Sequence, residues 1–161
     1  MKKKIQYYEP GNTDFWQGRQ DSLPNERIFQ QIKCLNIEKE SLPTDKTANI
    51  ILSFSSDEGV QRNLVRKGSI DGPDAIRSEL GRLASTNDKT MLDIGNITCK
   101  NHDLEKAQNS FAELINLCHQ QDNTTIALGG GHEIAWGHYQ GLAKQYSKIG
   151  IINFDAHFDI R

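Results

Sequence analysis

Residues 124–154, TTIALGGGHEIAWGHYQGLAKQYSKIGIINF, contain the pattern that decides the fold. An apolar run at 124–128 leads into a glycine-rich turn, a helix is expected from Glu133 to about Tyr146, and a second apolar run follows at 148–154. Short apolar runs that alternate with helical segments are typical of β-α-β units, in which the strands run parallel. This stretch therefore predicts a parallel sheet covered by helices.

The same alternation extends toward the amino terminus. Apolar runs predict buried strands at 49–55 and 91–97. A helix is expected over 73–85, where a proline suits the first turn, and apolar residues spaced by three and four predict another helix with Asp103 as its N-cap. The predicted fold class is α/β, with a doubly wound, mostly parallel sheet flanked by helices.

The first 46 residues differ from the rest of the chain. They are polar and interrupted by prolines, which predicts an irregular amino-terminal arm with one short helix near 25–36 and with Phe15 and Trp16 as anchors. The β/α core is expected to span residues 47–161. Because the sequence stops directly after its last predicted strand, without a helix to cover that strand's second face, we expect the amino-terminal part of one longer domain whose C-terminal half is absent.

Composition favours a folded cytoplasmic domain with small-molecule partners. Hydrophobic residues make up 36% and charged residues 25% of the chain, and the net charge is only -2, so nothing indicates nucleic-acid binding. No apolar run reaches the roughly 18–20 residues of a membrane span, and no apolar signal segment follows the amino-terminal lysines. Cys34, Cys99 and Cys118 have neither disulfide nor zinc spacing, and Cys118 is expected in the core.

Three potential metal ligands follow the last predicted strand. Asp155, His157 and Asp159 are two residues apart in sequence, so in extended backbone they share one face. Burying such groups without partners is costly, which favours a metal site. The alternative is a solvated polar loop.

A second polar group follows the strand at 124–128. Gly129, Gly130 and Gly131 allow unusual backbone conformations and close approach, and they place His132 at the strand exit. The turn could instead bind phosphate at a helix amino terminus. Because functional residues of parallel sheets gather at the carboxyl ends of the strands, we expect His132 to converge with the Asp155 segment. Nitrogen and carboxylate donors without thiolate favour Mn²⁺ or a similar ion.

At these residues the sequence resembles the arginase or ureohydrolase family, whose signatures include a Gly-Gly-x-His turn and an Asp-Ala-His-x-Asp strand exit. Within the family, residues 54–80 (FSSDEGVQRNLVRKGSIDGPDAIRSEL) are similar to the formimidoylglutamase branch, as is Glu133 where arginases and agmatinases usually have serine. Leu64 and Val65 depart from the branch pattern, which often has glycines there.

The resemblance implies an arginase-like three-layer α/β/α domain with two manganese ions. His132 and Asp159 would bind one ion, His157 the other, and Asp155 would bridge both, while two carboxylates of a later Asp-x-Asp motif would lie beyond Arg161. The implied reaction is hydrolysis of N-formimidoyl-L-glutamate to L-glutamate and formamide by a metal-activated hydroxide in histidine degradation. The alternatives are an agmatinase or guanidino-acid hydrolase and an inactive binding or assembly fragment. Family members commonly form homo-oligomers.

Other polar residues carry weaker expectations. Arg62, Asn63 and Arg66 follow the strand at 49–55 and are candidates for binding the carboxylates of the substrate, because guanidinium pairs well with carboxylate. They could equally fix the loop or line a subunit contact. Glu133 could complement a helix dipole or support His132.

Overall fold

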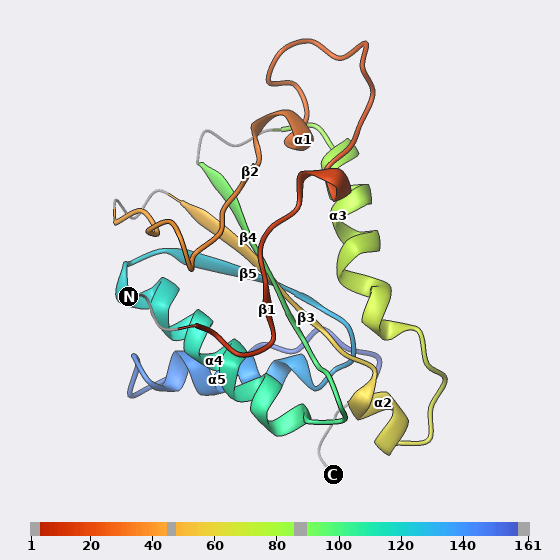
Figure 1. Ribbon diagram of the computed structural model, residues 1–161, viewed down its shortest axis with the longest axis vertical. Coiled ribbons are helices and arrows are strands. Elements are labelled where there is room, and N and C mark those ends of the chain that lie inside the picture. The colour runs from red at the N-terminus through yellow and green to blue at the C-terminus, as the bar shows by residue number, and fades with distance from the viewer. Residues whose placement is uncertain (1–3, 45–47, 86–89, 158–161) are drawn as a thin grey trace.

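A single sheet with helices on both faces forms the centre of the molecule (Figure 1). The computed structural model describes residues 4–44, 48–85 and 90–157. In it β3 (Asn49–Ser55) lies between β4 (Met91–Thr98) and β5 (Thr124–Gly129) and runs parallel to both. Along its other edge β4 pairs antiparallel with β1 (Tyr8–Glu9) and parallel with β2 (Lys33–Cys34). The sheet is mixed but mostly parallel, which confirms the predicted α/β class.

β3 is buried on both faces, as a central parallel strand requires. Successive side chains of a strand point to opposite faces. Ile50, Leu52 and Phe54 therefore pack with Phe111 in one cluster, and Ile51 belongs to a second cluster with Trp16. Both clusters are closed to solvent, so the apolar run in the sequence corresponds to the core of the fold.

Three longer helices cover the sheet. α3 (Gly72–Arg82) contacts β3 and β5 on the Ile51 face, α4 (Leu104–Gln120) covers the opposite face, and α5 (Ile134–Ala143) packs along α4. Asp103 occupies the N-cap position of α4 as predicted. Its carboxylate, however, makes no capping hydrogen bond and instead accepts from the Tyr7 hydroxyl and the Lys106 ammonium.

Shorter helical segments complete the fold, and their bounds are Thr13–Phe15 (η1), Ile28–Gln31 (α1), Glu58–Arg62 (α2) and Ser69–Asp71 (η2). In the ranges that the structure describes, the helices are too short or too polar to cross a membrane.

The amino-terminal arm is more ordered than its sequence predicts. The expected helix at 25–36 is wrong in extent, because only α1 is helical and the chain then forms β2. The β2 backbone pairs with β4, which lies about sixty positions further along the chain. A local sequence pattern cannot reveal such a distant partner. Trp16 is confirmed as an anchor, since it is buried and its indole Nε1 donates to Asp93 Oδ2 at 2.8 Å.

The predicted strand at 148–154 is wrong in this structure. None of these residues is in a strand, and Ile151, Ile152 and Phe154 are between 73% and 96% exposed. Apolar content makes a segment suitable for a strand, but a strand forms only where a neighbour supplies the hydrogen-bonding ladder. Within the described residues, this segment has no such neighbour.

Candidate metal centre

The turn that follows β5 lies directly against the end of β3. The backbone N–H of Gly130 donates to the carbonyl of Phe54 at 3.0 Å, and a Cβ added at Gly130 would be 2.7 Å from the carbonyl oxygen of Ser56. The glycines with positive φ are Gly68 and Gly95, so the turn needs its glycine for space and not for a left-handed backbone. Close packing against β3 therefore sets where the next residue, His132, projects.

His132, Asp155 and His157 lie close together at this end of the sheet. His132 Nδ1 is 3.8 Å from Asp155 Oδ2, and His157 Nδ1 is 3.5 Å from Asp155 Oδ1. The backbone N–H of His157 also donates to Asp155 Oδ1 at 3.0 Å. The structure thus brings together three of the four residues predicted as metal ligands. The fourth, Asp159, lies outside the described residues.

The surroundings of Asp155 favour its charged form. The hydrogen bond from the His157 backbone lowers the pKa of the carboxyl group, and the nearby imidazoles of His132 and His157 lower it further. Burial of the carboxyl acts in the opposite direction but is outweighed. Asp155 is therefore a carboxylate at neutral pH, which is the form in which this group can bind a cation.

The distances between pairs of donors agree with a divalent cation, but the described donors do not form a complete group. Ligand nitrogens and oxygens lie about 2.0–2.2 Å from a first-row ion, so two ligands of one ion are at most about 4.4 Å apart. Both donor pairs around Asp155 meet that limit. In the described ranges, however, no three or more His, Cys, Asp and Glu side chains already form a metal-binding group. The described residues meet in pairs, His132 with Asp155 and His157 with Asp155.

Cys118 takes no part in this site. Cys118 is fully buried in the core, as predicted, and burial raises its thiol pKa to about 12. A thiol that stays protonated is a poor metal ligand. The donors at the site are therefore imidazole and carboxylate.

The loop after β3 carries the three candidate substrate-binding residues. Arg62 is already engaged, because its Nε donates to Glu58 at 2.9 Å and its terminal nitrogens donate to Glu105. Asn63, at the end of α2, and Arg66 are exposed. These contacts agree with the alternative in which Arg62 fixes the loop.

Leu64, where the formimidoylglutamase branch often has glycine, lies beside these residues in a conformation that favours glycine. It is 95% exposed and has a φ of 57°, a conformation that glycine adopts without strain. The backbone at position 64 is thus left-handed although the residue there is leucine.

Glu133 makes a contact that sequence reasoning missed. Its carboxylate accepts a hydrogen bond from the backbone N–H of Gly59 in α2 at 3.0 Å, and it makes no capping hydrogen bond to α5, whose N-cap position it occupies. The two residues are 74 positions apart. No local pattern could have revealed this pairing.

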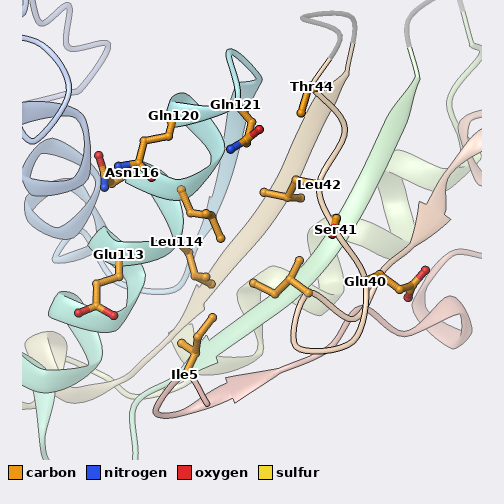
Figure 2. A pocket seen from close by; sticks show the side chains of 12 residues that line it. Ile5, Glu40, Ser41, Leu42, Thr44, Glu113, Leu114, Asn116, Gln120 and Gln121 are labelled. Carbon is orange, nitrogen blue, oxygen red and sulfur yellow. The ribbon is translucent and has the colours of Figure 1, made fainter. Parts of the chain in front are cut away.

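A cavity of about 630 Å³ lies elsewhere, between α4 and the segment before β3 (Figure 2). Leu42, Leu114 and Gln121 are among its lining residues, which places it toward the amino ends of β3 and β5. No predicted metal ligand lines it. Functional residues of parallel sheets gather at the opposite, carboxyl ends, so the cavity is separate from the candidate metal centre.

Comparison with known proteins agrees with the fold and the motifs. The arginase family model matches residues 48–161. A formimidoylglutamase of Legionella pneumophila is 47% identical over 154 residues, covering 96% of this chain and 48% of the relative. A formimidoylglutamase of Clostridium tetani is 41% identical over 96% of this chain and 49% of its own length.

Solved structures give the same result. The crystal structure of Trypanosoma cruzi formiminoglutamase with Mn²⁺ superposes with a TM-score of 0.67 at 27% identity, covering 84% of this chain and 46% of that chain. The chain spans about half the length of the curated relatives it matches. The family model, the relatives and the superposition agree: the chain belongs to the arginase family.

Proposed function

We propose that this chain supplies one side of the dinuclear manganese centre of a hydrolase that converts N-formimidoyl-L-glutamate to L-glutamate and formamide. The observation that carries the proposal is the approach of His132 and Asp155 within 3.8 Å at the carboxyl end of the sheet. These residues come from two separate motifs of the arginase family. Relatives named formimidoylglutamase, at 41–47% identity, support the choice of substrate.

Each ligand has a distinct role in this proposal. His132 and Asp159 would hold one ion, His157 would hold the other, and Asp155 would serve as a ligand to both. Each oxygen of the Asp155 carboxylate faces a different imidazole, with Oδ2 3.8 Å from His132 Nδ1 and Oδ1 3.5 Å from His157 Nδ1. Manganese held by these residues would supply Lewis acidity and, from a bound water, a hydroxide for attack on the amidine carbon at neutral pH.

Substrate recognition is assigned to the loop after β3. Arg66 and Asn63 are exposed and are the donors that we assign to the substrate carboxylates, while Arg62 holds the loop through Glu58 and Glu105. Guanidinium and amide donors match the carboxylates of a glutamate derivative. A guanidino substrate such as agmatine lacks these carboxylates.

Mn²⁺ binding tests the metal centre. We expect the chain to bind Mn²⁺, and His132→Ala and Asp155→Ala each to weaken binding at least about tenfold, because each removes a donor. Asp21→Ala is a matched control, since it removes an exposed carboxylate that pairs with Arg19. Equal Mn²⁺ affinity in all four proteins, measured by electron paramagnetic resonance of free Mn²⁺, would refute the assignment.

Product analysis tests the substrate. We expect negligible turnover by the 161-residue chain, because in this family further carboxylate ligands come from a later Asp-x-Asp motif. When the chain is extended to the full length of its relatives, formamide should be released from formimidoylglutamate and no urea from agmatine. Urea release would identify a guanidino hydrolase, and absence of both products would favour a binding or assembly role.

A further inference from the structure

We propose that Glu133 is a positioning residue that holds the His132 turn against α2 and thereby sets the direction of the His132 imidazole. The inference rests on the proposed metal centre and adds to it a residue outside the ligand set. It also assigns a purpose to the glycines at positions 59 and 131.

The carboxylate of Glu133 occupies a space that two glycines leave open. Its Oε1 accepts from the Gly59 N–H at 3.0 Å. A Cβ added at Gly59 would lie 2.5 Å from Oε2 of the same carboxylate, and a Cβ added at Gly131 would overlap that oxygen. A side chain at either position would therefore displace the carboxylate.

The backbone of Glu133 is held as well. Gln108 of α4, which is almost fully buried, donates from Nε2 to the Glu133 carbonyl at 2.9 Å. On the other side of His132, the Gly130 N–H is bonded to Phe54. The residues around His132 are thus tied to β3, α2 and α4, while the imidazole itself is 60% exposed and faces Asp155.

The segment that receives Glu133 is itself anchored. Asp57, directly before α2, accepts hydrogen bonds from Ser69 and Ile70, and Glu58 contacts the His102 imidazole at 2.7 Å. Glu133 therefore joins the His132 turn to a well-supported loop. That loop also carries the candidate substrate-binding residues, so the same contact fixes their position relative to the metal ligand.

A double-mutant cycle separates positioning from simple stabilisation. Glu133→Ala removes the carboxylate, and Gly59→Ala expels it without changing residue 133. Alanine is tolerated better than glycine inside a helix, and the added Cβ meets only the flexible end of a glutamate, so Gly59→Ala should leave the melting temperature nearly unchanged. Glu133→Gln keeps a hydrogen-bond acceptor. Glu79→Ala, which removes an exposed glutamate of α3, is the matched control.

The first measurement is amide hydrogen exchange of the metal-free chain, and the second is Mn²⁺ affinity. We expect faster exchange at residues 58–62 and 129–133 in Glu133→Ala, and about tenfold weaker Mn²⁺ binding in both Glu133→Ala and Gly59→Ala. Glu133→Gln should restore most of the affinity. The double variant should bind no more weakly than either single variant, because both remove the same contact.

Each outcome decides between the two proposals. If the unmodified chain binds Mn²⁺ and the variants bind it equally well, the positioning role is refuted while the metal centre stands. If the unmodified chain does not bind Mn²⁺, the metal centre is refuted. Independently of that result, unchanged amide hydrogen exchange in Glu133→Ala would refute the contact between Glu133 and Gly59. Additive losses in the double variant would also contradict the inference.

Discussion

At the residue scale, Arg77 and Asp93 form an ion pair in the interior of the fold. Both side chains are almost completely shielded from solvent. Asp93 accepts two hydrogen bonds from the guanidinium, one from the Trp16 indole and one from the Gly95 N–H. The pair thus joins α3, β4 and the amino-terminal arm. A buried charge is tolerated only when it is fully paired in this way.

Removing one partner should therefore destabilise the protein strongly. We expect Arg77→Ala to lower the free energy of unfolding by about 3–5 kcal/mol, because it leaves the Asp93 carboxylate buried and unpaired. The control is Arg82→Ala on the same helix, whose exposed pair with Glu79 contributes about 0–1 kcal/mol. Urea titration of both variants measures the difference, and similar midpoints would show that the buried pair is dispensable.

At the element scale, the loop between β3 and α3 depends on one carboxylate. Asp57 accepts hydrogen bonds from the Ser69 hydroxyl and from the backbone N–H groups of Gly68 and Ile70. Desolvation alone would raise the pKa of Asp57, but these donors stabilise the carboxylate more and lower its pKa. The loop that receives Glu133 is consequently held by a charged group.

This arrangement predicts how the stability contribution of the loop varies with pH. Because the folded pKa of Asp57 is lower than the unfolded value of about 3.9, the stabilisation is complete above that value. It is lost as the pH falls through the lower, folded pKa. Asp57→Asn should cost about 1–2 kcal/mol at neutral pH and progressively less below about pH 4. Urea midpoints of both proteins across this range test the prediction, and a gap that stays constant with pH would contradict it.

At the scale of the whole molecule, the edge strand β5 and the helix α5 both carry exposed apolar side chains. β5 lies at the edge of the sheet, and Ile126 on it is partly exposed. On α5, Trp136 and Tyr139 are stacked with ring centroids 5.9 Å apart and are also exposed. Exposed strand edges and large apolar side chains favour association.

We therefore expect the chain to self-associate in a concentration-dependent manner through these exposed side chains. Trp136→Glu should shift sedimentation-velocity profiles toward the monomer, because it places a charge in the middle of the exposed aromatic pair. Leu23→Glu, which changes an exposed leucine in the amino-terminal arm, should have little effect. A monomer at all concentrations, or equal effects of the two substitutions, would rule out this surface.

Much of the fold could be predicted from the apolar periodicity of the sequence. The strands at 49–55, 91–97 and 124–128 and the helix after Asp103 were predictable because apolar periodicity is a property of neighbouring residues. The same reasoning placed His132 at the end of a strand. That His132, Asp155, His157 and Asp159 bind metal stays a prediction, although the structure brings the first three together.

The sequence by itself determined the α/β class, the order of the long elements along the chain as far as α5, and the family motifs. Only the tertiary structure decided that residues 148–154 form no strand here, that β2 pairs with β4, and that Glu133 bonds to Gly59. The physical reason is the same in each case. Apolar periodicity describes what a segment can bury, whereas a hydrogen bond depends on which distant donor or acceptor the fold brings opposite it.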